Sequence, residues 1–242
     1  MGLKKMNWTP VKLVIALVLA AFLYGFAGHR HERQNVNSVV VQYDDYENLF
    51  VTEHQIQQAL IPGYTDSLVV AQNTLDITQL ERELRDHDLL QDAEVHLSLD
   101  GNLHARVLMR RPLARMATGS NSYVDDRGEF MPRSYVSSAR VPLISGLTDD
   151  NVADYMPLLH YVHNDTDLKR LVTSYKVASD GQVSLRLRQE NFAVLLGEPT
   201  ALKSKFMNLK AFLTKVHTDN TNTKYNTIDL RFAGQVVASK NE

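Results

Sequence analysis

The sequence contains no cysteine, and this absence excludes disulfide bonds, thiolate catalysis and cysteine-ligated zinc. It also lacks an excess of charge of either sign: the formal net charge is -2, so no basic field points to nucleic acid as a partner. No P-loop, G-x-G-x-x-G or G-x-S-x-G pattern occurs, and no period of about 20 to 50 residues recurs. The sequence therefore gives no support for nucleotide chemistry, a serine hydrolase, a bound cofactor or a small-molecule substrate.

Histidines are the remaining candidates for a metal site. His29 and His31 form the closest pair, but they stand beside arginines next to an apolar segment, where contact with lipid headgroups is the better interpretation. His160 and His163 are three residues apart on a predicted helix, and no third ligand accompanies them. We therefore expect no metal site.

Residues 13–28 carry no charge and are the candidate for a membrane segment. A helix of this length rises about 24 Å, short of the roughly 30 Å hydrocarbon core, although local thinning of the bilayer tolerates short spans. Lysines before the segment outnumber arginines after it, which favours residues 1–12 as a cytoplasmic tail and the bulk of the chain outside the cytoplasm. The alternative is a cleaved signal peptide, for which Gly25-Phe26-Ala27 is a small-x-small cleavage site. We favour a single transmembrane helix.

Two helices are predicted after this segment. Thr52 and Gln55 form a capping-box pattern at the start of the first helix, and Pro62-Gly63 ends it. Asp76 or Thr78 caps the second helix, whose apolar residues fall on one stripe.

Three strands complete this region. Residues 37–43 are rich in β-branched side chains, which favour a strand. Residues 93–99 and 103–109 alternate apolar and polar side chains around the turn Asp100-Gly101-Asn102, a pattern typical of a β-hairpin. The order is β-α-α-β-β, which predicts a small sheet with both helices on one face. Just outside a single membrane span, this order resembles the POTRA domain, a module that recruits other chains, and we place it at residues 35–112.

The remaining residues, 113–242, predict a mostly antiparallel β-domain with two flanking helices, so that the whole chain is of the α+β class. Asp149 or Asp150 is expected to cap the first of these helices, and a wide apolar stripe marks the second. Residues 123–125 are expected to form a strand, and residues 126–130 a glycine turn and a return strand. The other expected strands are residues 172–178, 182–187, 192–196, 225–232 and 235–238, and the expected helices are residues 152–163 and 201–217.

Charged residues gather where the two predicted domains meet. We predict an ion network between the domains; the alternative is that edge charges keep a strand from pairing with other chains. The residues at this seam are Arg110, Arg111, Pro112, Arg115, Asp125 and Asp126.

Several short motifs of the second half occur together and in order behind the single apolar segment. They are Arg111-Pro112-Leu113-Ala114-Arg115, Tyr123-Val124-Asp125-Asp126-Arg127-Gly128 with Met131-Pro132, Arg140-Val141-Pro142 with Gly146, Leu196-Gly197, and Ile228-Asp229-Leu230-Arg231-Phe232 with Gly234. With these motifs the chain resembles the FtsQ/DivIB family of bacterial cell-division proteins, and more particularly its Bacteroidetes-type members.

The resemblance implies a non-catalytic scaffold of the inner membrane at the division septum, with a short cytoplasmic tail, one span, a POTRA domain and a β-domain in the periplasm. Members of the family recruit FtsB and FtsL, and through them the septal peptidoglycan synthase pair FtsW and FtsI. The residues that the resemblance assigns to strand pairing with FtsB are Asp229, Leu230, Arg231 and Phe232, continued by Gly234, Gln235, Val236, Val237 and Ala238.

Two other functions remain open at this point. A secreted or anchored envelope enzyme is compatible with a cleaved signal peptide, although no catalytic motif supports it. A POTRA-type chaperone of outer-membrane assembly is disfavoured, because such proteins carry repeated modules or a following β-barrel.

Overall fold

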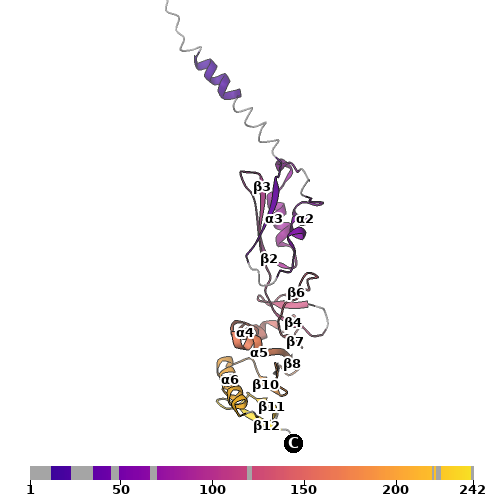
Figure 1. Ribbon diagram of the computed structural model, residues 1–242, viewed down its shortest axis with the longest axis vertical. Helices are drawn as coiled ribbons and strands as arrows, with labels where there is room; N and C mark the ends of the chain where they lie inside the picture. The colour runs from indigo at the N-terminus through magenta and orange to yellow at the C-terminus, as the bar shows by residue number, and fades with distance from the viewer. Residues whose placement is uncertain are drawn as a thin grey trace, which may run out of the picture. The chain divides into compact units, whose positions relative to one another are not determined.

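The computed structural model describes residues 12–22, 35–44, 49–65, 70–118, 122–219, 221 and 225–240 (Figure 1). The chain divides into two compact units, one made of Met1–Asp44 and Thr52–Leu108 and the other of Asp45–Val51 and Met109–Glu242. We describe each unit by itself.

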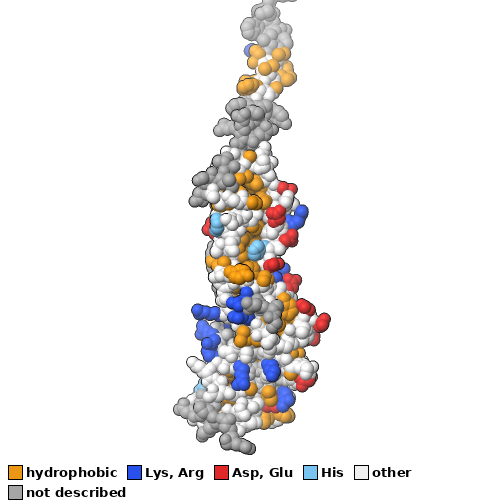
Figure 2. All heavy atoms as spheres, turned by 90° about the vertical axis from the view of Figure 1, so that its right-hand side faces the viewer, with side chains coloured by type: hydrophobic (Ala, Val, Ile, Leu, Met, Phe, Trp, Pro, Cys, Tyr) orange, Lys and Arg blue, Asp and Glu red, His pale blue; other side chains and the backbone are white. Residues whose placement is uncertain are grey.

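Residues 12–22 form a helix whose side chains are exposed along its whole length, many of them apolar (Figure 2). Within the part of the chain that the structure describes, no helix has the length and apolar character needed to cross a membrane. The predicted span at residues 13–28 continues past residue 22, and both that continuation and the first eleven residues of the predicted cytoplasmic tail lie outside the described residues.

The first unit is a three-stranded sheet with two helices, in the predicted order β-α-α-β-β. Strand β1 (Ser38–Tyr43) lies parallel to the central strand β3 (Asn102–Met109), and β2 (Leu90–Leu97) lies on the other side of β3. Between β1 and β2 come helices α2 (Glu53–Leu60) and α3 (Ile77–Arg85) and a short 3-10 helix, η1 (Gln72–Thr74).

Both helices of the first unit begin as their sequences predict. The Thr52 side chain accepts a hydrogen bond from the Gln55 backbone N–H at 3.2 Å, while the Gln55 side chain accepts one from the Thr52 N–H at 2.8 Å, so the capping box is confirmed. Of the two candidate caps for α3, the structure uses Asp76, whose carboxylate accepts from the Gln79 N–H at 3.1 Å. Each cap satisfies backbone donors that the first turn of a helix leaves unpaired.

One face of the first sheet is covered and the other is open to solvent. Alternate residues of β3, namely Leu103, Ala105 and Val107, are buried. On the opposite face, the rings of His96 and His104 stack at 5.0 Å, which is the alternation expected of a half-buried sheet.

The second unit contains a nine-stranded sheet in the order β12-β11-β10-β9-β8-β7-β4-β5-β6. Most neighbouring strands are antiparallel, as predicted, but β10–β11, β4–β7 and β7–β8 are parallel pairs. The strands are β4 (Pro112–Met116), β5 (Ser122–Asp125), β6 (Phe130–Pro132), β7 (Leu143–Ser145), β8 (Val172–Val177), β9 (Val183–Leu187), β10 (Ala193–Gly197), β11 (Tyr225–Asp229) and β12 (Val237–Lys240).

Helices α4 (Val152–Asn164), α5 (Thr166–Leu171) and α6 (Leu202–Thr218) lie on the same side of these strands in Figure 1. Helix α6 buries Phe206, Leu209 and Leu213, which belong to the apolar stripe predicted for it. The helices and the sheet share one hydrophobic core.

Two expectations about the helices of the second unit were wrong. The prediction of two helices missed α5, a six-residue helix that Asp165 caps by accepting from the N–H groups of Asp167 and Leu168. Helix α4 begins after Asn151 rather than after Asp149 or Asp150, and the Asn151 side chain accepts from the Thr148 N–H at 2.8 Å instead of capping the helix. The start of α4 therefore has no side-chain cap, and residues 148–151 form a turn before it.

Gly146 provides a test of this packing. Its φ is +81°, and a Cβ at this position would lie 2.1 Å from the carbonyl oxygen of Val177. We expect Gly146→Ala to lower the free energy of unfolding of the second unit by about 3 kcal/mol, because the positive φ and the displaced backbone each add a cost. Urea denaturation of the full chain, with hydrogen exchange to identify the second unit, measures the change.

Gly234→Ala is the matched control for this prediction. Gly234 has a similar φ of +74°, but a Cβ there would meet no atom within 4 Å. This variant is expected to cost about 1 kcal/mol through its backbone conformation alone. Equal costs for the two variants would contradict the close approach of Gly146 to β8.

Candidate functional site

The end of the second unit's sheet differs in detail from the predicted strands. The strand expected at residues 225–232 ends at Asp229, although the Leu230 N–H still donates to the Leu195 carbonyl of β10 at 2.9 Å. The strand expected at residues 235–238 begins two residues later and runs from Val237 to Lys240. Between them lies a turn that contains Phe232 and Gly234, and both predicted boundaries are corrected accordingly.

Strand β11 is an interior strand, and β12 is the outermost strand of the described sheet. Ile228 is paired with Val194 of β10 on one side and with Ala238 of β12 on the other. Asp229 therefore has neighbouring strands on both sides, whereas β12 has a described neighbour only on the side of β11. Of the residues predicted to pair with a partner strand, only Val237 and Ala238 belong to the outermost strand.

The direction of the backbone groups in β12 follows from the ladder. Successive residues of a strand point their N–H and C=O groups to opposite sides. Since the Leu230 N–H points to β10, the groups of Asp229 point to β12 and pair with Val237, which lies opposite. The N–H and C=O of Ala238 are then directed away from β11, toward the open side of the sheet.

The turn after β11 is fixed by Asp229 and Arg231. The Arg231 guanidinium donates to both carboxylate oxygens of Asp229, with a shortest distance of 2.6 Å, and the Arg231 backbone N–H donates to the same carboxylate at 3.0 Å. This hydrogen bonding by Arg231 lowers the pKa of Asp229 below its ordinary value, against the opposing effect of burial. Asp229 is thus a buried residue that shapes the turn.

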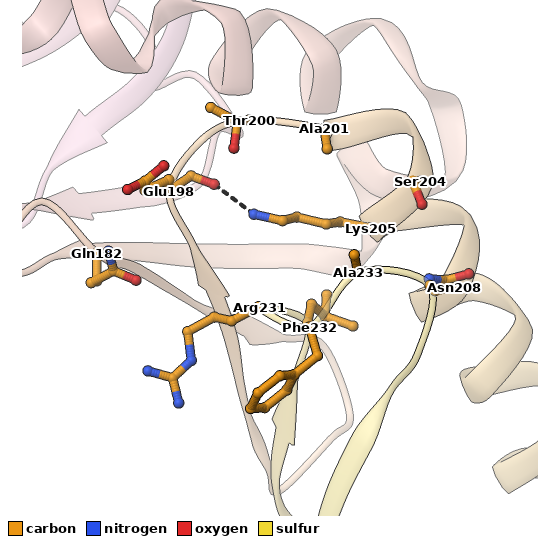
Figure 3. A pocket seen from close by; sticks show the side chains of 12 residues that line it. Gln182, Glu198, Thr200, Ala201, Ser204, Lys205, Asn208, Arg231, Phe232 and Ala233 are labelled. Atoms are coloured by element: carbon orange, nitrogen blue, oxygen red, sulfur yellow. Dashed lines mark hydrogen bonds between the residues drawn. The ribbon is translucent and has the colours of Figure 1, made fainter.

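A pocket of about 380 Å³ opens beside this turn (Figure 3). In Figure 3, Arg231 and Phe232 lie on one side of the pocket, and Glu198 and Lys205 lie on the other. The residues that line it come from three separate segments of the chain: Gln182, residues 198–208 at the start of α6, and residues 230–234. Phe232 is the apolar group at its mouth, with 48% of its surface exposed.

Lys205 lines this pocket. Its Nζ donates to the carbonyl oxygens of Leu196 at 2.9 Å and Glu198 at 2.7 Å. Partial burial lowers the pKa of Lys205, while the charge of Glu198 acts in the opposite direction. Lys205 therefore joins the end of β10 to the first turns of α6.

A second hollow and a glycine lie beside this pocket. The hollow adds apolar surface, and the glycine lets Arg231 pack against β10. A neighbouring hollow of about 460 Å³ on the first turns of α6 includes Met207, which is 60% exposed. Gly197 allows the Arg231 side chain to approach β10, since a Cβ at Gly197 would lie 2.8 Å from Arg231 Cγ. The site is thus an open strand edge next to a pocket with the exposed Phe232 and a neighbouring hollow with the exposed Met207.

The residues predicted to form an inter-domain seam all lie in the second unit. Arg110 binds Asp125 at 2.7 Å and Glu129 at 3.3 Å, and the buried Asp125 also accepts from the N–H groups of Arg127 and Glu129. This cluster holds the turn between β5 and β6.

The other seam residues lie on β4, directly before it, or directly after β5. Pro112 is paired with Asp125 across β4 and β5, and the Arg111 carbonyl accepts from the Asp126 N–H at 2.9 Å. The Nε of Arg115 and the Oδ1 of Asp126 are buried without a hydrogen-bond partner.

The described residues contain no group of three His, Cys, Asp or Glu side chains able to hold a metal ion. His29 and His31 lie outside the described residues, and His160 and His163 both lie on α4.

Sequence reasoning did not identify Gln182, Lys205 or Met207 as part of a site. Leu196-Gly197 before α6 was a usable signal, because a glycine at the end of a strand often marks a close backbone approach. The pocket itself is formed by segments that are about 20 to 50 residues apart in the chain. A local sequence pattern does not predict that such segments lie together in the fold.

A family model described as FtsQ/DivIB, C-terminal related, matches residues 111–239. The matched range begins just before β4 and includes the turn, the pocket and nearly all of β12. No curated protein matches the chain.

The Asp229–Arg231 pair makes the stability of this site depend on pH. Because the pKa of Asp229 is lowered on folding, its contribution is fully present above the ordinary aspartate pKa of about 4 and is lost as pH falls through the folded-state value. We expect Asp229→Asn to lower the Tm at neutral pH and to weaken the fall in Tm below about pH 4. Thermal unfolding across this pH range measures both effects, with Asp149→Asn on the exposed surface as control. Parallel pH profiles for Asp229→Asn and the parent chain would contradict the assignment.

Proposed function

Because the chain belongs to the FtsQ/DivIB C-terminal related family, we propose that it is a non-catalytic cell-division scaffold that recruits FtsB and FtsL, and through them FtsW and FtsI. The match covers the second unit from β4 to β12, which is the part of the chain that carries the candidate site.

Strand pairing at β12 is the proposed mode of FtsB capture, and the open edge of β12 is the observation that carries the proposal. An extended segment added to a sheet edge gains affinity from main-chain hydrogen bonds, and pockets for its side chains supply specificity. The outward N–H and C=O of Ala238 would be the central pair of such a ladder. Val237, 42% exposed, lies next to them.

The pocket beside the turn between β11 and β12 would supply the specificity. Phe232 offers apolar contact area in this pocket and Met207 in the neighbouring hollow, and aromatic side chains at an interface commonly carry much of the binding energy. We assign Asp229 and Arg231 a positioning role, because they hold each other and so fix the turn that presents Phe232.

The first unit and the N-terminal segment complete the proposal. We assign residues 35–112 to a POTRA domain and residues 113–242 to the β-domain, both in the periplasm, with residues 13–28 as the inner-membrane span and residues 1–12 in the cytoplasm. The exposed apolar side chains of the helix at residues 12–22 support an anchor, since an apolar surface of this extent is costly in water.

Ala238→Pro tests the strand pairing. Proline removes the outward N–H of β12 and leaves the inward hydrogen bonds of Val237 and Ser239 in place, so we expect affinity for FtsB to fall at least about tenfold while Tm changes little. Ala238→Ser keeps the N–H and is the matched control. Titration of purified chains with FtsB gives the affinities.

Phe232→Ala is a second test of the site that does not depend on the proline variant being folded. Phe232 takes no part in the strand ladder and is about half exposed, so its loss should not disturb the fold. We expect it to weaken FtsB binding by about tenfold through lost contact area. Parent-like affinity for FtsB in both a folded Ala238→Pro chain and Phe232→Ala would refute the proposed site.

Removal of residues 1–28 tests the anchor separately. We expect the full chain to stay with membranes after alkaline carbonate extraction, because an apolar span is held by the hydrocarbon core. The truncated chain should be released, because it has lost that span. Sequencing of the mature N-terminus provides the control, because a start near Gly28 would point to cleavage and contradict an anchor.

A further inference from the structure

A cationic groove lies on the second unit, away from the pocket beside β12. It consists of two adjoining pockets of about 600 and 690 Å³ that share Arg140, His163 and Lys169. No residue of this groove lines the pocket at the turn after β11. Lys and Arg side chains are seen to gather on the second unit in Figure 2.

The cations of this groove come from segments far apart in the sequence. One end is lined by Arg111 next to β4 and by Arg140 from the loop before β7. The other is lined by Lys169 and Arg170 of α5 and by Arg188 after β9. The fold thus brings several positive side chains to one concave surface.

Two backbone contacts hold α5 and Arg188 together. The Arg188 N–H donates to the Leu171 carbonyl at 2.7 Å, and its Nε donates to the Arg170 carbonyl at 3.0 Å. Arg188 is therefore fixed across the end of α5, which places its charge at the wall of the groove.

The acidic residues of α5 do not line the groove. Asp165 and Asp167 bind Lys210 of α6, at 2.8 Å and 3.2 Å. Among the described residues that line the two pockets there is no Asp or Glu. The exposed Arg140, Arg170 and Arg188 therefore make the groove complementary to a negatively charged ligand, and arginines suit carboxylates because they can donate two hydrogen bonds at once.

One end of the groove is also apolar. Leu49, Pro112, Val136 and Val141 line it together with the hydroxyl groups of Ser137 and Ser138. Val136 is 43% exposed. Among the described residues that line the two pockets there is no Phe, Tyr or Trp.

We propose that this cationic groove binds an acidic, aliphatic segment of another protein, with its carboxylates on Arg140 and Arg170 and an aliphatic side chain against Leu49 and Val136. The shape favours a peptide over a membrane surface, because a bilayer is flat and a recessed groove of this size accommodates a chain. The surface is a second docking site, separate from the strand edge of β12.

The double variant Arg140→Glu/Arg170→Glu tests the proposal, because both side chains are exposed and the fold should tolerate the change. The probe is a fluorescein-labelled peptide of repeated Glu-Glu-Leu, read by fluorescence anisotropy against the full chain in detergent. We expect the parent to bind this peptide, the double variant to bind it about tenfold more weakly, and added salt to weaken parental binding. The matched control is Lys176→Glu/Arg186→Glu, an equal charge change at exposed strand positions outside the groove, which should alter affinity less than about twofold.

Three outcomes with the peptides would overturn this inference. They are an absence of binding to the parent, an equal loss in the control variant, and equal binding of a Gln-Gln-Leu peptide that lacks the carboxylates. Binding of phosphatidylglycerol vesicles without binding of the peptide would also overturn it in favour of a lipid surface. FtsB titration of the groove variant keeps this test separate from that of the β12 edge, since FtsB binding should be unchanged.

Discussion

A β-sheet satisfies the hydrogen-bonding groups of each strand only through its neighbours, and this constraint organises the second unit. Its nine strands pair in one continuous order, so β12 and β6 are the two strands of the described sheet with a neighbour on one side only. Strand β6 is three residues long and ends in Pro132, which cannot donate to a partner. Strand β12 contains no proline, so each of its residues keeps its backbone N–H. Only the charge of Lys240 at its end disfavours pairing with another strand.

The position of that edge depends on the residues that end β11. The ion pair of Asp229 with Arg231 and the close approach of Arg231 to Gly197 fix the turn, and the turn sets where β12 begins. Beneath them, Phe206 and Leu209 of α6 and Ile228 of β11 belong to one core, so the edge rests on a packed support. A rigid edge reduces the entropy lost when a partner strand binds.

Much of the fold was predictable, because local signals and global packing agree. Residues close together in the sequence were enough to predict the capping box at Thr52, the hairpin at Asp100-Gly101 and the apolar stripe of α6. Helix α5 was missed because six residues are too few for a helical period, and the end of β11 was misplaced because its apolar alternation continues past Asp229. The pocket and the groove could not be predicted, since each joins distant segments that only the tertiary fold brings together.

The proposed function depends on the addition of a partner strand to β12. Amide hydrogen exchange of the full chain with and without FtsB tests it most directly, because a new ladder slows exchange at the outward N–H groups. We expect bound FtsB to protect Ala238 strongly, while Val237 and Ser239, already paired with β11, change less. Protection confined to β6 or to the first unit, with β12 unchanged, would contradict it.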